Sequence, residues 1–359
     1  MMQKVNVGVV GLGAIARAHI PALQSLGEKC QIVAICDISE AAVKLWGDQL
    51  KLPEDKRYRT YQEFIKEPAM NVVDILTPNQ FHRDITLAAI EAGKHVIVEK
   101  PIARTLQEAD AMINAAKKNR VQLMSAHNRR YCRTFSLAKQ AMAKVGEPYA
   151  ASCDWRFYNP YEVTRGFRAD KTLSGGGNLI DNGWHAVDLI RWLVGEVTEV
   201  FAYWSQKGLG GLSTGEDTIL CIFKHQNGAI SQVLNSWGPG PARSDVTIYG
   251  LNGTVVVNPE TYRLYRPQPY GSEREILRRR RELGLSESTA HDVTLVERLE
   301  ASPLDLGMGW AGFPEMLNAF MDAILAKKQV PIPATEGRRI LQIILAAYES
   351  ADKAKRVKV

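Results

Sequence analysis

The segment VGVVGLGAIARAH, residues 7–19, decides the fold because it joins an apolar run to a helical pattern through two glycines. Gly11, Gly13 and Ala16 form a G-x-G-x-x-A pattern. In this pattern the first glycine permits a tight turn, the second lets a pyrophosphate approach the backbone, and the alanine lets helix and strand pack closely. The helix N-terminus would then present free N–H groups to the phosphates. The pattern predicts a dinucleotide-binding turn; a strand-to-helix turn without a ligand is the alternative.

The residues after the second expected strand indicate which dinucleotide is bound. Asp37 ends that strand, where a carboxylate accepts hydrogen bonds from the adenosine ribose hydroxyls and repels a 2′-phosphate. Ile38 and Ser39 follow, with no Arg or Lys to hold such a phosphate. We therefore expect NAD rather than NADP, and the alternative role for Asp37 is a helix N-cap. The cofactor contacts expected here are Gly11, Gly13, Ala14, Ile15, Asp37 and Ile38.

The first third of the chain alternates short apolar runs with helical patterns, which is typical of a doubly wound parallel sheet in an α/β (Rossmann) domain. The expected strands are residues 4–10, 31–37, 71–77, 94–100 and 121–127. The expected helices are residues 14–26, 39–50, 80–92 and 104–119. After about residue 128 the pattern changes, so we predict an NAD-binding domain over residues 1–128 and a substrate-binding and oligomerisation domain over residues 129–359.

The second domain is predicted to be α/β, with an open and mostly antiparallel sheet. Strand-like runs cover residues 197–206, 217–224, 229–237, 244–249 and 253–257, joined by turn sequences such as HQNGAI and GLNGTV. Helical patterns cover residues 133–144, 181–194, 312–327 and 335–354. Residues 258–310 include the basic run EREILRRRRELG at 273–284, and we expect a charged helix and an irregular excursion there.

Composition limits the class of protein. With 359 residues, 45% of them hydrophobic and 23% charged, the chain matches an ordinary globular protein of two domains. The net charge of +6 is too small to indicate nucleic-acid binding, and no apolar run reaches the ~18 residues of a membrane span. The five scattered cysteines contain no CxxC pair, which argues against disulfides or a zinc site and favours the cytoplasm. We expect no metal, no nucleic-acid partner and no membrane partner.

A second informative segment is SGGGNLIDNGWHAVDLIRWLVG, residues 174–195. Its apolar residues recur at three- and four-residue spacing, which predicts one buried helix face. Asp181, His185 and Asp188 recur beside this stripe, so the first two would lie one helical turn apart. Imidazole titrates near neutral pH and suits proton transfer, whereas a structural histidine and an Asp N-cap are the alternatives. Asp188 is expected to be a structural ion-pair or surface group.

The segment VIVEKPIA, residues 96–103, gives the most specific signal. Glu99-Lys100-Pro101 lies at the carboxyl end of the fourth expected strand, the edge at which open α/β sheets bind ligands. Together with the glycine turn, TPNQFH at 77–82 and GGNLIDNGWHAVDLIRWL at 176–193, it resembles the glucose-fructose oxidoreductase / inositol dehydrogenase / rhizopine-catabolism (Gfo/Idh/MocA) family. The resemblance extends from the first strand to about residue 260.

The resemblance implies roles for individual residues. Lys100, Asp181 and His185 would be catalytic, while Thr77, Asn79, His82 and Glu99 would line the nicotinamide half of the cofactor groove. One arginine of NRRY at 128–131, either Arg129 or Arg130, would contact the substrate. The open sheet of the second domain commonly makes subunit contacts in this family, so the resemblance also implies a homodimer or homotetramer.

The segment before the glycine-rich helix supplies further substrate-binding candidates. Aromatic side chains stack on the apolar faces of sugar rings, and arginines bind hydroxyls or carboxylates. The candidates in this segment are Trp155, Arg156, Phe157, Tyr158, Arg165 and Arg168. We expect Trp155 and Phe157 to belong to the core. The expected substrate-binding residues are Lys100, Arg129, Arg130, Tyr158, Arg168, Asp181 and His185.

These residues define a reaction. His185 would accept the hydroxyl proton of an alcohol substrate, and the Lys100 ammonium would stabilise the developing alkoxide. We therefore predict an NAD-dependent oxidoreductase that transfers a hydride between nicotinamide and a secondary hydroxyl or ketone of a sugar, cyclitol or sugar derivative. Two alternatives are an NAD-dependent glycosidase that uses transient oxidation and a non-catalytic nucleotide-sensing protein on the same fold.

Overall fold

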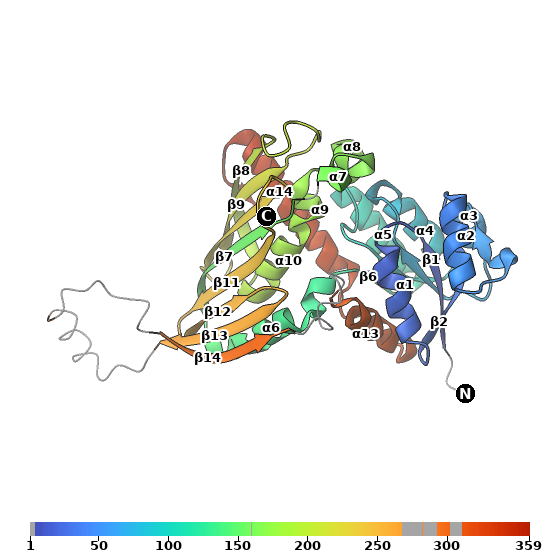
Figure 1. Cartoon of the computed structure of the whole chain (residues 1–359), viewed down its shortest axis with the longest axis horizontal. Helices are drawn as coiled ribbons and strands as arrows, with labels where there is room; N and C mark the ends of the chain where they lie inside the picture. The colour runs from blue at the N-terminus through green and yellow to red at the C-terminus, as the bar shows by residue number, and fades with distance from the viewer. Residues whose placement is uncertain (1–3, 159, 268–281, 283–292, 302–310) are drawn as a thin grey trace.

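The protein is described by a computed structural model that covers residues 4–158, 160–267, 282, 293–301 and 311–359. A parallel sheet flanked by helices occupies the first part of the chain, and a larger, mixed sheet occupies the second part (Figure 1). The helices α10 and α14 lie between the larger sheet and the first domain in this view. This arrangement confirms the predicted α/β class.

The first sheet has six parallel strands within the described residues, in the order β3-β2-β1-β4-β5-β6. The strands are β1 (Val5–Val10), β2 (Cys30–Cys36), β3 (Arg57–Tyr58), β4 (Val72–Ile75), β5 (His95–Val98) and β6 (Leu123–Ser125). The helices are α1 (Ala16–Ser25), α2 (Glu40–Gln49), α3 (Tyr61–Phe64), α4 (His82–Glu91) and α5 (Leu106–Asn119), with 3₁₀ turns η1 (Glu54–Lys56) and η2 (Asn79–Phe81). The predicted elements are present. The short β3 and α3 were missed because so few residues give no hydrophobic period.

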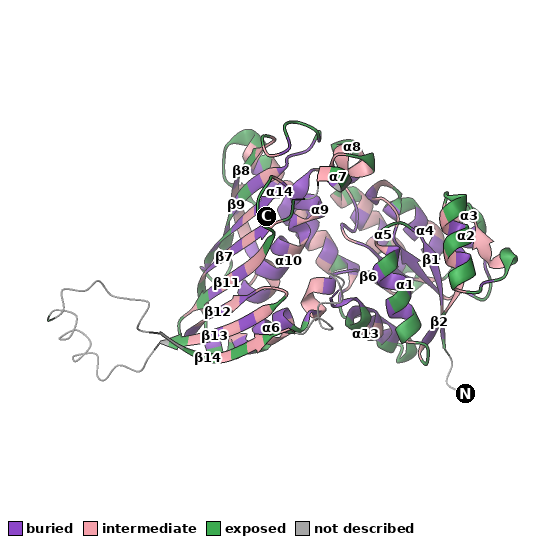
Figure 2. Cartoon of the chain, in the orientation of Figure 1, coloured by how far each residue is buried: buried purple, intermediate pink, exposed green. Residues whose placement is uncertain are grey.

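The strand order places the glycine turn at the functional edge of this sheet. β1 pairs with β2 on one side and with β4 on the other, so the strand order reverses at β1. Open α/β sheets bind ligands in the crevice at such a reversal, outside the carboxyl ends of the strands. The strands are largely buried on both faces, which explains their continuously apolar sequences (Figure 2).

The second sheet has nine strands within the described residues, in the order β14-β13-β12-β11-β7-β10-β9-β8-β15. Its strands are β7 (Pro148–Arg156), β8 (Val197–Ser205), β9 (Thr218–His225), β10 (Ile230–Ser236), β11 (Arg243–Gly250), β12 (Gly253–Val257), β13 (Thr261–Pro267), β14 (Val293–Glu300) and β15 (Val357–Lys358). Only the β7–β10 pair is parallel among these neighbours. The mostly antiparallel sheet was predicted correctly.

Four strands of this sheet, β7, β13, β14 and β15, were not predicted, and the expectation for the segment 258–310 was wrong for residues 261–267 and 293–300. β13 and β14 extend the antiparallel sheet within that segment, where we expected a helix and an irregular excursion. Their alternation is obscured by the polar side chains of an edge region. The expected charged helix at 273–284 lies outside the described residues, Glu282 excepted.

The second part of the chain also contains helices, some of which cover one face of the second sheet. They are α6 (Arg133–Val145), α7 (Pro160–Val163), α8 (Lys171–Ser174), α9 (Asn178–Asp181), α10 (Gly183–Val194), α13 (Phe313–Leu325) and α14 (Ala334–Lys353), with 3₁₀ turns η3 (Asn128–Tyr131) and η4 (Gly166–Ala169). Among the residues that the structure describes, none of the helices has the length and apolar content needed to cross a membrane.

The predicted single helix over 181–194 is in fact two helices, α9 and α10, which meet at Asn182. The His185 N–H donates to the Asn182 carbonyl oxygen, three residues back, at 3.4 Å. The α-helical pattern, in which each N–H donates to the carbonyl four residues back, is therefore interrupted there. The Asn182 side chain also accepts a hydrogen bond from Trp155 Nε1 at 3.2 Å. Asp181 therefore ends one helix, and it does not cap the next one, whose N-cap is Asn182.

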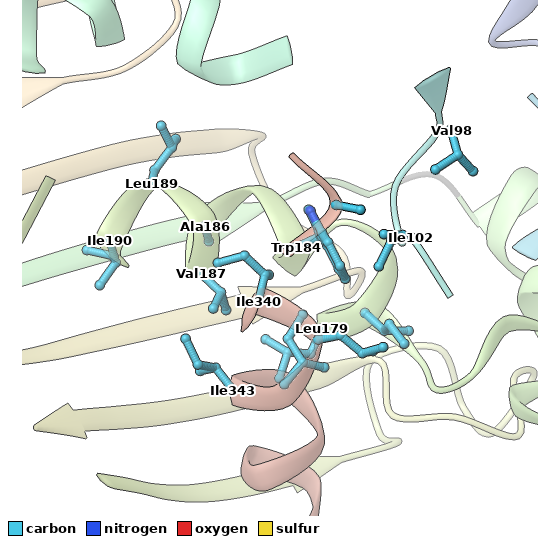
Figure 3. Packing of buried hydrophobic residues seen from close by; sticks show 14 of the residues in the cluster. Val98, Ile102, Leu179, Trp184, Ala186, Val187, Leu189, Ile190, Ile340 and Ile343 are labelled. Atoms are coloured by element: carbon cyan, nitrogen blue, oxygen red, sulfur yellow. The ribbon is translucent and has the colours of Figure 1, made fainter. Parts of the chain in front are cut away.

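The core behind the site is formed where α10 packs against α14. Trp184, Val187 and Ile190 of α10 and Ile340 and Ile343 of α14 are fully buried and belong to one apolar cluster (Figure 3). Figure 3 shows these side chains filling the space between the two helices. The spacing predicted for the buried stripe of residues 174–195 is thereby confirmed.

The helix α13 links the two parts of the chain. It packs against α1 and β1, and its side chains share an apolar cluster with residues of the first sheet (Figure 1). Phe320 and Met321 of α13 and Ile20 and Leu23 of α1 are all buried in this cluster. The predicted domain boundary near residue 128 stays a prediction, because residues from both sides of it build this core.

We expect Ile340→Ala to lower the free energy of unfolding by about 2–5 kcal/mol, because it leaves a cavity between α10 and α14. Urea denaturation followed by circular dichroism measures this loss. The control is Leu45→Ala, at a helix position that is 52% exposed, where the change should stay within about 0.5 kcal/mol. Equal effects of the two substitutions would contradict the packing described here.

Candidate functional site

The centre of the site is an ion pair between the two parts of the chain. Lys100 follows β5, and its Nζ donates to Oδ1 of Asp181 at 3.0 Å and to the Asp181 carbonyl oxygen at 2.8 Å. Arg168 Nε donates to the other carboxylate oxygen of Asp181 at 3.0 Å. Burial by itself would raise the pKa of Asp181, but the Lys100 and Arg168 charges hold it well below its usual range. Asp181 is therefore a carboxylate that fixes the Lys100 ammonium.

His185, at the start of α10, lies in the electrostatic field of this centre. Burial lowers the pKa of His185 well below its usual value, and the charges of Lys100 and Arg129 lower it further. Its ring lies 6.0 Å from the ring of Trp155, measured between centroids. The imidazole is consequently neutral at physiological pH and able to accept a proton.

A buried histidine that the sequence analysis missed holds the segment containing Lys100. His19 of α1 is fully buried, with Nδ1 2.8 Å from Oδ2 of Asp74 and Nε2 3.0 Å from Oε1 of Glu99. Burial would lower the pKa of His19, but the two carboxylates raise it to about 10. The imidazolium can therefore donate to both carboxylates. A histidine on a helix near a glycine turn gives no sequence signal for these distant partners.

Glu99, which we predicted to line the cofactor groove, directs its carboxylate toward the protein. Its Oε1 faces His19, and its Oε2 accepts a hydrogen bond from the Lys100 N–H at 3.1 Å. Burial acts to raise the pKa of Glu99, but the hydrogen bond and charge of His19 lower it below its usual value. Glu99 thus orients the backbone at Lys100.

His82 and Asn79, two other residues predicted to line the groove, connect neighbouring segments of the backbone. His82 is buried, with Nδ1 2.8 Å from the Pro101 carbonyl oxygen and Nε2 2.8 Å from that of Thr77. Asn79 Nδ2 donates to the Ser174 carbonyl oxygen at 2.7 Å and so joins the first domain to the loop before α9. These side chains position the loops on which Thr77 and Lys100 lie.

The structure separates the roles of the two neighbouring arginines. Arg130 forms ion pairs with Asp188, at 2.6 Å from Nη2, and with Glu336, at 3.0 Å. Asp188 is buried and is also 2.9 Å from Nδ1 of His127, which agrees with the structural ion pair we predicted for it. Arg129 instead places its guanidinium 5.9 Å from the centre of the Trp155 ring, beside His185.

The aromatic residues predicted near the substrate differ in how far they are buried. Trp155 is 2% exposed and belongs to the core, as predicted. Phe157 is 48% exposed, so its prediction as a core residue was wrong. The reason is that β7 ends at Arg156, and the strand alternation that would bury Phe157 ends with it. Tyr158 follows in the same connection and is 47% exposed.

The glycine turn after β1 has the geometry that a dinucleotide requires. Gly11 has φ +94°, and a Cβ there would lie 2.6 Å from the Leu76 carbonyl carbon, so only glycine fits. A Cβ on Gly13 would project into open space, which leaves this side of the turn free for a phosphate. Ala14 and Ile15 come directly before α1, whose first N–H groups, those of Ala16, Arg17 and Ala18, donate to the carbonyl oxygens of Gly13, Ala14 and Ile15 at 3.2, 3.2 and 2.9 Å.

Asp37 holds this turn from the neighbouring strand. Its Oδ2 accepts a hydrogen bond from the Leu12 N–H at 2.6 Å, and its Oδ1 accepts one from the Ser39 N–H at 2.8 Å. Ser39, and not Asp37, is the N-cap of α2. Ile38 is 83% exposed beside it. The residues present therefore fit a dinucleotide with an unphosphorylated adenosine ribose.

Comparison with known proteins agrees with this geometry. The model of the Gfo/Idh/MocA oxidoreductase family, NAD-binding Rossmann fold, matches residues 5–127, and the model of the family's C-terminal domain matches residues 135–256. The myo-inositol 2-dehydrogenase of Thermotoga maritima is 30% identical over 238 residues, which cover 64% of this chain and 68% of that protein. The levoglucosan dehydrogenase of Pseudarthrobacter phenanthrenivorans is 29% identical over 297 residues, with 72% of this chain and 75% of that protein covered.

A similar solved structure spans the whole chain. A levoglucosan dehydrogenase in complex with NADH and L-sorbose superposes with a TM-score of 0.84 at 25% identity, and covers 100% of this chain and 99% of that one. The assignment to a family rests on two family models that match consecutive parts of the chain. The topology of the two sheets and the NAD-type glycine turn agree with it. The chain belongs to the Gfo/Idh/MocA family of oxidoreductases, and its first domain is an NAD-binding Rossmann fold.

Proposed function

We propose that this protein is an NAD-dependent dehydrogenase that acts on a secondary hydroxyl of a sugar, cyclitol or sugar derivative. The observation that carries the proposal is an ammonium, Lys100, which Asp181 holds in place and whose charge acts on the neutral imidazole of His185. Alcohol oxidation needs both a proton acceptor and a positive charge near the alkoxide oxygen. The similarity to dehydrogenases named for levoglucosan and myo-inositol supports the substrate class.

Each residue has a distinct step in this reaction. NAD, when bound, supplies the nicotinamide carbon that accepts the hydride. His185 takes the hydroxyl proton, and Lys100 stabilises the negative charge on the oxygen as the carbonyl forms. In the reverse direction the Lys100 ammonium polarises the ketone. Asp181 keeps Lys100 in place, while Arg129 and Arg168 border the same centre and are our candidates for binding substrate hydroxyls.

We further propose which residues hold NAD. The turn of Gly11, Gly13, Ala14 and Ile15 receives the pyrophosphate, and Asp37 with Ile38 borders the adenosine ribose. Thr77, Asn79, His82 and Glu99 form and orient the edge beside the nicotinamide through the contacts described above. Arg130 is left out of the substrate contacts, because Asp188 and Glu336 use its guanidinium.

A panel of aldoses, inositols and sugar acids tests the proposed activity directly. We expect at least one member to produce NADH in stoichiometry with a ketone or lactone product, followed by absorbance. NAD should give at least about ten times the kcat/KM of NADP, because Asp37 repels a 2′-phosphate. Hydrolysis of glycosides without net NADH would instead support the glycosidase, and NAD binding without any turnover would support the nucleotide-sensing protein.

Substitutions at the two central residues test the mechanism. His185→Ala and Lys100→Ala should each lower kcat about 100-fold or more, the usual effect of losing an acid–base or charge-stabilising group. Stopped-flow measurement of NADH formation gives the rate. Matched controls are His95→Ala and Lys94→Ala, at partly buried positions in and beside β5, and these should stay within about threefold. Wild-type turnover in either central variant would refute its assignment.

We also propose that the protein is a homodimer or homotetramer that associates through the outer face of the second sheet. That face carries exposed apolar side chains at alternating strand positions, among them Tyr203, Leu220, Ile222, Ile230 and Tyr249. Exposed apolar patches of this kind mark interaction surfaces. Light scattering should give the mass of two or four chains, and Ile222→Glu should lower that mass, whereas Leu45→Glu on α2 should not. A monomeric wild-type protein at micromolar concentration would reject this proposal.

A further inference from the structure

A buried carboxyl–phenol pair lies beneath the loop that leads to Asp181, and the mechanism above does not use it. Glu216, in the connection between β8 and β9, is 5% exposed. Tyr348 of α14 donates its hydroxyl proton to Oε1 of Glu216 at 3.0 Å. Burial and the nearby Glu216 charge raise the pKa of Tyr348 well above its usual value, so this hydroxyl keeps its proton.

The pair accepts the backbone N–H groups at the beginning of α9. Oε2 of Glu216 accepts from Gly177 at 2.9 Å, and Oε1 accepts from Leu179 at 2.7 Å. The Tyr348 oxygen accepts from Ile180 at 3.2 Å. N–H groups in a first helical turn have no partner within the helix, so these side chains supply the acceptors that hold α9.

The loop before α9 is in close backbone contact with the loop that contains Glu216. A Cβ on Gly177 would lie 2.1 Å from the Glu216 carbonyl oxygen, and a Cβ on Gly215 would lie 2.5 Å from the Gly177 Cα. The Asn178 N–H donates to the same Glu216 carbonyl oxygen at 2.8 Å. The two loops therefore meet backbone to backbone, and glycine is required at both positions.

The other side of the loop borders open space. Glu216, Tyr348 and Gly176 line a cavity of about 370 Å³ together with Trp204 and Lys171. The cavity borders the loop only, because Leu179 and Ile180 of α9 itself are fully buried in the apolar cluster. The hydrogen bonds to Glu216 and Tyr348, and not packing alone, determine where α9 lies.

We propose that Glu216 and Tyr348 are positioning residues, which fix α9 so that Asp181 holds the Lys100 ammonium in its reactive place. Asp181 directly follows Ile180 at the end of α9, and both its carboxylate and its carbonyl oxygen contact Lys100. A shift of α9 would thus move both acceptors of the Lys100 ammonium together. This inference rests on the proposed function, in which Lys100 and Asp181 belong to the catalytic centre.

The charge state of Glu216 sets the assay conditions. Burial raises the pKa of Glu216 to about 7, although its hydrogen bonds oppose the rise. At pH 8.5 the group is mainly ionised, and its two oxygens then accept all three donors. Glu216→Gln replaces one of these oxygens by an NH₂ group, which cannot accept, at almost unchanged volume. Tyr348→Phe removes the hydroxyl alone.

We expect Glu216→Gln and Tyr348→Phe each to lower kcat/KM at least about tenfold at pH 8.5, with the Kd for NADH within about twofold of wild type. Matched controls exist for both. Glu67 is 2% exposed and accepts the Tyr58 hydroxyl at 2.8 Å, and Tyr262 is 3% exposed and donates to Glu297 at 3.0 Å. Glu67→Gln and Tyr262→Phe should change kcat/KM less than about twofold. Circular dichroism confirms folding, and Tyr348→Phe decides the matter if Glu216→Gln does not fold.

A double-mutant cycle with Asp181→Asn shows whether the effect passes through Asp181. In that background Glu216→Gln should change kcat/KM by less than about twofold. A full tenfold loss in both backgrounds, wild-type kcat/KM in folded Glu216→Gln and Tyr348→Phe, or equal losses in the controls would each overturn the positioning role. Wild-type activity in Asp181→Asn alone would instead overturn the proposed function at this residue, so the two failures are distinguishable.

Discussion

The ion pair between Lys100 and Asp181 is the interaction on which the site depends, because it joins the end of a strand in one sheet to a helix that packs on the other. Both groups are largely buried, and a buried charge is tolerated only when it is paired and hydrogen-bonded. Asp181 meets this condition with contacts to Lys100 and Arg168. The same contacts keep the Lys100 ammonium at the carboxyl edge of the first sheet, where the proposed reaction would use it.

The environment of the side chain, and not the residue type, sets the charge of His185, His19 and His82. Burial lowers the pKa of His185, and the charges of Lys100 and Arg129 lower it further, so its imidazole is neutral. His19 lies between two carboxylates, which raise its pKa to about 10, so its ring is a cation at neutral pH and supports Glu99, which holds the backbone at Lys100. His82 lies between backbone carbonyls, and burial lowers its pKa. Three histidines thus lie in three different electrostatic environments.

Support for the centre comes from three directions. Behind Lys100 the carboxylate of Glu99 holds the backbone, and behind Asp181 the pair Glu216–Tyr348 holds α9. The third support is the apolar packing of α10 on α14, which fixes the helix that carries His185. Burying polar groups lowers the stability of the folded state unless each group is hydrogen-bonded. When all of them are hydrogen-bonded, they hold the surrounding residues in a single arrangement.

The sequence by itself determined most strands of the first sheet, the central antiparallel strands β8 to β12 of the second, the NAD-type glycine turn and the family. These depend on local patterns: apolar periods, glycines at a tight turn and the Glu99-Lys100-Pro101 tripeptide. The sequence also singled out Lys100, Asp181 and His185. Only the tertiary structure decided what surrounds them. The contacts of His19 with Asp74 and Glu99, of Arg130 with Asp188, and of Glu216 with α9 join residues 37 to 80 positions apart, and no local pattern records such distances. The ion pairs that set charge and pKa exist only after the two sheets have come together.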